Sequence, residues 1–467
     1  MSKRLPFLII LSAVLLITLA ACGQQVVEVT RVVTETQTET VTEEVEVTRV
    51  ITETEVETVT EEVPVEVTRI VEVEAEEAEP IIIGATGPLS APGSVGGGIA
   101  MQFTAELAVD EINEAGGVLG RPIELVFVDT QGLPERGTAV AERLIEENGA
   151  VGIIGEYHSA VGLTMKEVCH ERHVPCVFSE TWNDDITGSG YDEVFRVAVT
   201  STLVASQQIN WLEALGFEYI VIIAENTDYG VPASEAQVEY MTEKGIDSEV
   251  LFVELGTEDF LPVLTRIQEG ERTPDAIMIL VTGETSYNVE QQMAEIGLAP
   301  TAETVCVANQ VAINAEYWDN VPDGNFCAYL RVGLTPNNYN DVTLGVDEAY
   351  REQFDRPAPS FALATYDSVY IMADAIERAG STDPDAIIAE IEATDTTLAQ
   401  GHYYFPYGMN NPVPDDVPEW MWHQWPDAAV VIQQYFEQDQ DPDEAAVVFP
   451  EIFQTHGTFL IPFGESP

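Results

Sequence analysis

The sequence predicts an α/β protein made of two doubly wound, parallel-sheet lobes. From residue 81 onward, short apolar runs alternate with longer amphipathic stretches, a pattern typical of βαβ units. The series starts again after residue 200, which indicates a second sheet. Ligands of such sheets bind beyond the carboxyl ends of the strands, so the loops that follow the strands are the candidate site.

The first series is recognised by runs of Ile, Val and Phe that end at Gly, Asp or Ser. We expect strands at 81–85, 123–129, 151–155 and 174–179, with helices at 100–115, 135–147 and 163–170 between them. The segment 195–197 is interpreted as the crossing to the second series. There we expect strands at 219–224, 249–253, 276–281 and 304–308, and helices at 203–215, 231–244, 259–269 and 286–297.

The amino terminus has the charged, apolar, small-residue order of a secretory signal. Lys3 and Arg4 precede an apolar run at 5–19, which is shorter than the roughly 20 residues of a membrane-spanning helix. Leu-Ala-Ala-Cys at 19–22 resembles the bacterial lipobox, in which the Cys is acylated. We therefore expect a signal peptide at 1–22, export, and a lipid on Cys22 that holds the protein at the membrane surface.

Residues 23–79 form a low-complexity segment of Val, Ile, Thr and Glu, in which Glu-Val-Thr-Arg recurs at 28–31, 46–49 and 66–69. Val and Thr alternate with Glu, which favours an extended chain over a helix. A coiled-coil stalk fits less well because a and d positions are not held by apolar residues. We interpret the segment as an acidic spacer rather than a tail without function, because like charges extend a tethered chain.

The charge balance excludes one class of partner. The chain has 81 acidic and 18 basic side chains, a formal net charge of −63. Such a chain repels phosphate backbones, so we expect no nucleic-acid binding.

Four cysteines lie beyond Cys22, an even number that suits disulfides in an oxidising compartment. Three pairings are possible. Proximity in sequence favours Cys169 with Cys176 and Cys306 with Cys327.

Several motifs stand out beyond residue 80: Ile-Ile-Ile-Gly-Ala-Thr-Gly-Pro-Leu-Ser at 81–90, the stretch 108–122, and short segments at 128–130, 153–155, 228–230, 259–260 and 364–367. Together they closely resemble the branched-chain amino-acid type periplasmic binding proteins. The resemblance covers nearly all of 81–425. It implies two lobes joined by three crossovers that close over a small polar solute, with no cofactor, no metal and no catalysis.

The resemblance also implies lobe boundaries and partners. Crossovers fall near Val199, Arg331 and 420–425, and late helices at 341–355 and 361–379 complete the first lobe. The first lobe is then 80–199 plus 332–419, and the second is 200–331 plus 420–467. We expect a monomer that docks on an ABC permease. The stretch from 420 departs from the family's compact ending and either wraps a lobe or forms an added wall of the cleft.

In the first lobe, the resemblance places ligand contacts in the loops 155–160 and 178–182. Ser159 matches the anchoring serine of the family, Thr181 matches its second-loop hydroxyl, and Ser179 offers backbone groups. Tyr157 and Glu180 lie in the same loops and join the candidates. The alternative is that Ser159 and Thr181 only cap helices.

In the second lobe, Tyr229 matches a position from which the family closes an aromatic ring over the ligand. Asn309 stands where the family has an acidic partner for the ligand's ammonium. An amide cannot neutralise an ammonium, so an amino acid would need Glu180, Glu156 or Glu284 instead. Amides, ureas and small carboxylates therefore remain alternatives to an amino acid.

Three alternative functions follow from other features of the sequence. Cys, His and Glu at 169–176 suggest a zinc site, against a helix end that carries a Cys pair. His158 beside Ser159 suggests a hydrolase, but no Gly-x-Ser-x-Gly elbow surrounds them. An exported ligand sensor of the same fold is the main alternative to transport.

Overall fold

The computed structural model of the chain describes residues 40–41, 44–46, 60–62, 65–66 and 78–456. The predicted signal peptide with Cys22 and most of the spacer lie outside the described residues. Within the spacer, β1 (Thr40–Val41) pairs with β4 (Val65–Glu66), and β2 (Glu44–Glu46) pairs with β3 (Thr60–Glu62), all antiparallel. These described pieces are in strand conformation, which Val and Thr favour.

A five-stranded parallel sheet forms the first lobe, with strand order β6-β5-β7-β8-β9. The strands are β5 (Ile81–Gly87), β6 (Ile123–Asp129), β7 (Gly152–Gly155), β8 (Cys176–Phe178) and β9 (Val194–Arg196). Ile81, Ile83 and Ala85 of β5 face one hydrophobic cluster, and Ile82 faces another. Both faces of the sheet are therefore covered, as a nearly continuous apolar strand predicts.

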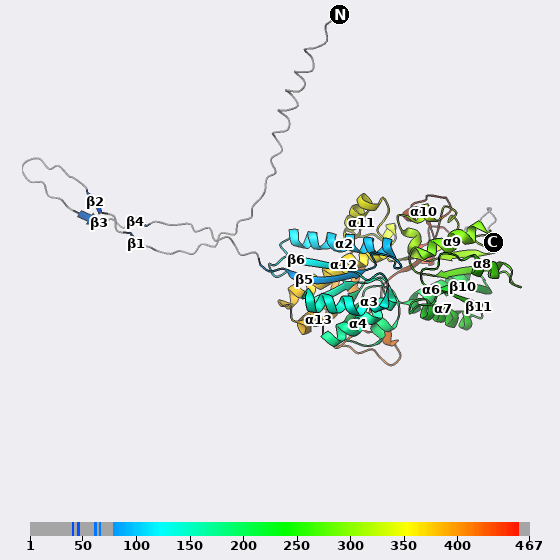
Figure 1. Ribbon diagram of the computed structural model, residues 1–467, viewed down its shortest axis with the longest axis horizontal. Helices are drawn as coiled ribbons and strands as arrows, with labels where there is room; N and C mark the ends of the chain where they lie inside the picture. The colour runs from blue at the N-terminus through cyan, green and yellow to red at the C-terminus, as the bar shows by residue number, and fades with distance from the viewer. Residues whose placement is uncertain (1–39, 42–43, 47–59, 63–64, 67–77, 457–467) are drawn as a thin grey trace, which may run out of the picture. The chain divides into compact units, whose positions relative to one another are not determined.

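Helices cover the first sheet on both faces (Figure 1). They are α2 (Val95–Glu114), α3 (Pro134–Glu142), which continues as a π-helix at Arg143–Glu147, α4 (Ser159–Arg172), the short α5 (Asp185–Gly188), α11 (Asp341–Phe354), α12 (Ser360–Ala379) and α13 (Pro384–Glu392). Residues of α2 and α12 share one buried cluster, and residues of α3 and α4 share the other. The first lobe is therefore doubly wound.

A seven-stranded sheet forms the second lobe, with order β11-β10-β12-β13-β14-β17-β18. Its strands are β10 (Tyr219–Glu225), β11 (Asp247–Val253), β12 (Ala276–Leu280), β13 (Val305–Ala308), β14 (Ala328–Val332), β17 (Val430–Gln434) and β18 (Ala446–Phe449). Its helices are α6 (Ser201–Ala214), α7 (Gly230–Lys244), α8 (Leu261–Gln268), α9 (Thr285–Glu295) and α10 (Tyr317–Asn320). The predicted fold class, two α/β lobes on largely parallel sheets, is confirmed.

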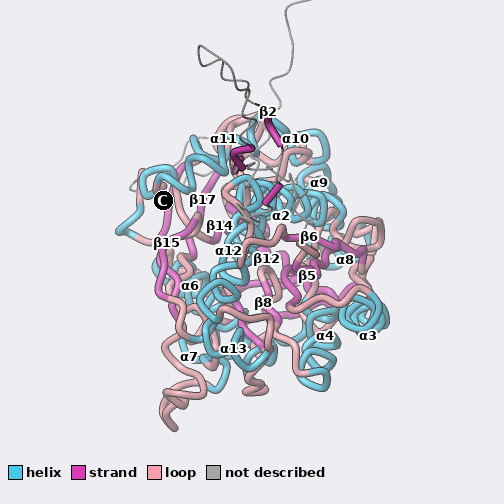
Figure 2. Tube along the Cα trace, turned by 90° about the vertical axis from the view of Figure 1, so that its left-hand side faces the viewer, coloured by secondary structure: helices cyan, strands magenta, loops and turns pink. Residues whose placement is uncertain are grey.

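The chain passes between the two sheets three times, after β9, after β14 and before β17. The hairpin of β15 (Asp395–Leu398) and β16 (Gly401–Tyr404) lies before the last passage. β17 then pairs antiparallel with β14 (Figure 2), and β18 pairs antiparallel with β17. The described part of the C-terminal stretch therefore extends the second sheet, while the lobe boundaries inferred from the resemblance stay a prediction.

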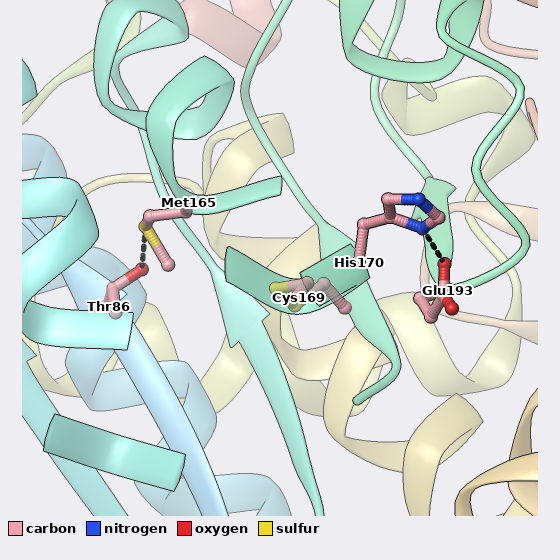
Figure 3. Close-up of a disulfide and its surroundings, with 6 residues drawn as sticks. Thr86, Met165, Cys169, His170 and Glu193 are labelled. Carbon is pink, nitrogen blue, oxygen red and sulfur yellow. Dashed lines mark hydrogen bonds and ion pairs between the residues drawn. A yellow bond between two sulfur atoms is a disulfide. The ribbon is translucent and has the colours of Figure 1, made fainter. Parts of the chain in front are cut away.

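Each of two disulfides joins a cysteine to the next cysteine along the chain. Cys169 bonds Cys176 with a Cα–Cα distance of 6.4 Å, and Cys306 bonds Cys327 with a distance of 4.8 Å. Figure 3 shows Cys169 on α4 between Met165 and His170. These are the pairs that the spacing favours.

Candidate functional site

The carboxyl ends of strands from both sheets surround one small cavity of about 30 Å³. Its lining consists of Tyr157, His158, Ser159, Glu180, Trp182, Tyr229, Thr282, Asn309 and Gln310. The first five follow β7 and β8, and the others follow β10, β12 and β13. The cavity therefore lies where the topology of doubly wound sheets predicts a ligand.

The loop after β7 is shaped by a buried carboxyl group. Glu156 has a positive φ of 66° and is fully buried, and its Oε1 accepts a hydrogen bond from the His158 backbone N–H at 3.0 Å. Burial raises the pKa of Glu156 to about 7. This arrangement turns the three residues that follow, Tyr157 to Ser159, toward the cavity.

His158 lies in the cavity wall as a neutral imidazole. Its Nε2 accepts a hydrogen bond from the Ser94 backbone N–H at 3.1 Å. Burial lowers its pKa to about 4, so the ring carries no charge at neutral pH. The side chain supports the loop that precedes α2 rather than supplying a cation to a ligand.

Ser159 begins α4 and connects the two loops of the first lobe. Its Oγ accepts hydrogen bonds from the backbone N–H groups of Trp182 at 3.0 Å and Asn183 at 3.1 Å. The hydroxyl proton is then left to donate. Because Ser159 lines the cavity at a helix amino terminus, it can donate to an anionic or carbonyl oxygen of a ligand.

Tyr229 and Asn309 form the facing wall in the second lobe. The Asn309 Nδ2 donates to the Tyr229 hydroxyl at 3.3 Å, and its Oδ1 accepts from the Gln310 backbone N–H at 2.8 Å. The Tyr229 ring meets the Trp182 ring edge to face, with centroids 6.1 Å apart. Burial raises the pKa of the Tyr229 phenol, so the wall is aromatic and uncharged.

Hydrogen bonds between the lobes surround the cavity. The Gly96 N–H donates to Glu284 Oε1 at 2.6 Å, and Asn183 Nδ2 donates to the Asp228 carbonyl at 2.6 Å. Gln310 Nε2 donates to Glu180 Oε1. These contacts show that the lobes are closed on each other. A larger groove of about 620 Å³ shares His158, Ser159 and Tyr229 with the cavity.

Comparisons with known proteins agree with this geometry. A family profile described as periplasmic binding protein matches residues 80–411. The chain belongs to the periplasmic binding protein family.

A Leu/Ile/Val-binding protein homologue of Brucella melitensis is 26% identical over 318 residues, which are 66% of this chain and 82% of that protein. The substrate-binding protein LivJ of Streptococcus pneumoniae, solved with isoleucine, has a TM-score of 0.66 at 20% identity and covers 80% of this chain and 100% of its own. A solute-binding protein of an ABC transporter from R. palustris, solved with benzoate, has a TM-score of 0.67 at 16% identity, with coverages of 79% and 95%.

Membership of the family defines the class of protein. This periplasmic binding protein is an exported solute-binding protein. It binds solute and is not an enzyme. Among the described helices, none has both the length and the apolar composition needed to cross a membrane.

Five of the seven candidate ligand-binding residues line the cavity of this periplasmic binding protein. They are Tyr157, Ser159, Glu180, Tyr229 and Asn309. Ser179 instead hydrogen-bonds Thr365 of α12 at 2.9 Å, and the buried Thr181 hydroxyl has no hydrogen-bond partner among the described residues. Neither lines the cavity in this closed structure, because the backbone turns both side chains into the lobe.

Besides His158, three residues that line the cavity were not among the ligand-binding candidates: Trp182, Thr282 and Gln310. Each lies in a strand-end loop, directly after a candidate residue or after a strand. Thr282 is held by the buried Glu225, to which its hydroxyl donates at 2.5 Å. The strand-end rule points to all three, whereas side-chain type alone does not.

The zinc and hydrolase alternatives do not fit the geometry of this binding protein. The sulfur atoms of Cys169 and Cys176 are bonded to each other, so neither can serve as a thiolate ligand. The Nδ1 atoms of His170 and His173 both face Glu193, at 2.9 and 2.6 Å (Figure 3 shows the first contact). The Nε2 of His158 is occupied by the Ser94 N–H rather than by Ser159.

Proposed function

We propose that this periplasmic binding protein captures an α-amino acid in the cavity and delivers it to its permease. The observation that carries the proposal is the pairing of opposite chemistry across the cavity. The Ser159 hydroxyl, at the start of α4, can donate to a carboxylate, while the Glu180 carboxyl group lies among the lining residues. Among the described residues, no Lys or Arg lines the cavity. A zwitterion uses both ends of such a site.

The names of the relatives support the same proposal. A homologue is named for binding Leu, Ile and Val, and a protein of the same fold was solved with isoleucine. Tyr157, Trp182 and Tyr229 offer aromatic surface for an apolar side chain. A small uncharged amide or a carboxylate such as benzoate is the second candidate, because Asn309 stands where the family has an acidic residue and one neighbour in fold holds benzoate.

The cavity volume implies motion between the lobes. A space of about 30 Å³ holds no more than about two water molecules. A ligand as large as leucine therefore requires a wider cleft, and we expect an opening and closing movement coupled to binding. Small-angle scattering of residues 78–467 should show a smaller radius of gyration at saturating ligand than without ligand.

Titration calorimetry tests the ligand class. Leucine, isoleucine and valine should bind with Kd values near the micromolar range, with leucinamide and benzoate as comparison ligands. Tight binding of benzoate or an amide, with no binding of the amino acids, would select the second candidate. Mass spectrometry of solute that co-purifies would then identify the molecule.

We further propose that a lipid on Cys22 anchors the protein and that residues 23–79 act as its acidic spacer. The support is sequence alone: an apolar run followed by Leu-Ala-Ala-Cys. Cys22→Ala protein should leave the membrane fraction, whereas Cys22→Ala protein that stays with the membrane would count against the anchor.

A membrane permease encoded beside this protein would favour transport, and a neighbouring sensor kinase without a permease would favour sensing.

A further inference from the structure

One carboxyl group among the residues that line the cavity has no cationic partner. Glu180 is 6% exposed, and no Lys, Arg or His of the described residues forms an ion pair with it. A carboxylate buried without a cation is costly, so such groups either take up a proton or meet a positive ligand.

The other carboxyl groups near the cavity do not line it and accept hydrogen bonds from the protein. Glu156 accepts from the His158 N–H and does not line the cavity. Glu225 accepts from the Thr282 hydroxyl and N–H, the latter at 2.9 Å. Glu284 accepts from the Gly96 N–H at 2.6 Å. Of these four carboxyl groups, Glu180 is the one that lines the cavity and can meet a ligand there.

A side chain of the opposite lobe reaches Glu180. Gln310 follows β13 in the second lobe, and its Nε2 donates to Glu180 Oε1. The amide is oriented by Ser360 at the start of α12, whose hydroxyl donates to Gln310 Oε1 at 2.9 Å. Gln310 thus lies between two side chains of the first lobe, and its contacts with them join the two lobes.

We propose that Glu180 binds the ammonium of the ligand and that Gln310 completes this subsite from the opposite lobe as the lobes close. The inference rests on the proposed function, because it assigns the residues that bind the ammonium end of the proposed amino-acid ligand. It moves the ammonium partner from the second-lobe position, which Asn309 occupies here, to the second loop of the first lobe.

The proposal predicts a pH signature. Burial raises the pKa of Glu180 well above its ordinary value in the closed form. Closure over a ligand without an ammonium must therefore bring a proton to Glu180, whereas closure over an ammonium leaves the carboxylate ionised. Affinity for the first kind of ligand then falls as the pH rises, by up to about tenfold per pH unit.

Other titratable groups in the cavity affect both ligands alike. Tyr157, Tyr229 and His158 share the lining with Glu180. Burial raises the pKa of both phenols and lowers that of His158 to about 4. Their contributions cancel in the ratio of two affinities measured on the same protein.

The test compares leucine with 4-methylpentanoate, which has the same skeleton without the ammonium. Calorimetry at pH 6, 7 and 8 should show a leucine preference that grows by up to about tenfold per pH unit in the wild-type protein. In Glu180→Gln the preference should drop by about ten- to a hundredfold and become independent of pH. Glu180→Asp should retain part of the preference.

Two further variants guard against a general loss of structure. Gln310→Leu should weaken the binding of leucine by about tenfold, because a hydrogen bond to a charged group is lost. Glu284→Gln, which alters a contact between the lobes outside the cavity lining, should change both affinities by the same factor. If Glu180→Gln still binds leucine with an unchanged preference over 4-methylpentanoate, the inference is wrong and the proposed function stands. Failure of the wild-type protein to bind any amino acid would overturn it together with the proposed function.

Discussion

The two lobes meet at the cavity and at a loop near the carboxyl terminus, and carboxyl groups behave differently in these two regions. At the cavity, Glu156 and Glu180 are buried without a cation, and burial raises the pKa of both. In the loop 435–445, between β17 and β18, Asp441 and Asp443 are paired with arginines. In the first region the carboxyl groups can bind a proton or a ligand. In the second region they form ion pairs that join parts of the chain.

The loop 435–445 connects the second lobe to the first. Arg351 of α11 pairs with Asp441 at 3.0 Å and also with Asp443. Arg331 of β14 pairs with Asp443 at 2.9 Å, and its guanidinium donates to the Tyr339 hydroxyl at 2.6 Å. Because Tyr339 belongs to the segment that leaves β14 for α11, this network holds one of the three passages between the sheets. We expect it to persist while the cavity side opens.

The largest expected effect is at Arg331, whose side chain is 4% exposed. Arg331→Met keeps the apolar stem but leaves Asp443 with one arginine fewer. We expect the free energy of unfolding to fall by about 3–5 kcal/mol, the usual cost of breaking a buried ion pair, in urea denaturation.

Arg266→Met is the matched control, because Arg266 pairs with Glu249 but is 67% exposed. Its loss should cost less than about 1 kcal/mol. Equal effects of the two substitutions would mean that the loop 435–445 contributes no more than a surface ion pair.

Ser159→Ala should have the next largest effect, and on the cavity side. The variant loses a donor to the ligand, so we expect affinity to fall by about 1.5–3 kcal/mol, or roughly ten- to a hundredfold, in calorimetry. Thr181→Val should change affinity less, since the Thr181 hydroxyl does not line the cavity here. An equal loss in both variants would favour the site with two hydroxyl contacts that the sequence predicts.

The smallest expected effect concerns Glu156 and has a defined sign. Its pKa is raised from 4.5 to about 7 by burial, so its contribution to stability is fully present below about pH 4.5 and is lost as the pH rises through 7. Glu156→Gln should therefore be more stable than the wild-type protein at pH 8, by roughly 1–3 kcal/mol, and closer to it at pH 5. Urea denaturation at both pH values measures this, and a gain that is larger at pH 5 would contradict it.

Much of this protein was accessible from local sequence. The alternation of apolar and amphipathic stretches predicts the two sheets, because a strand buried on both faces needs a continuous apolar run. The predicted strand at 123–129 coincides with β6, and the late helices at 341–355 and 361–379, which the resemblance implies, correspond closely to α11 and α12. The β15–β16 hairpin and the strands β17 and β18 were not predicted, since their short runs lie among aromatic and proline residues without a regular period.

The sequence by itself predicted that ligand contacts lie in strand-end loops, because a residue placed just after a buried strand must emerge at the same edge of the sheet. The resemblance to the family then placed Ser159 and Tyr229 among the candidates. Only the tertiary structure decided which side chains of those loops face the cavity. Ser179 turns to Thr365 and Thr181 turns inward, while Gln310 crosses from the other lobe to Glu180. The physical reason is that side-chain direction in a loop follows from packing against segments far away in the sequence, and those contacts form only when both lobes are folded and closed.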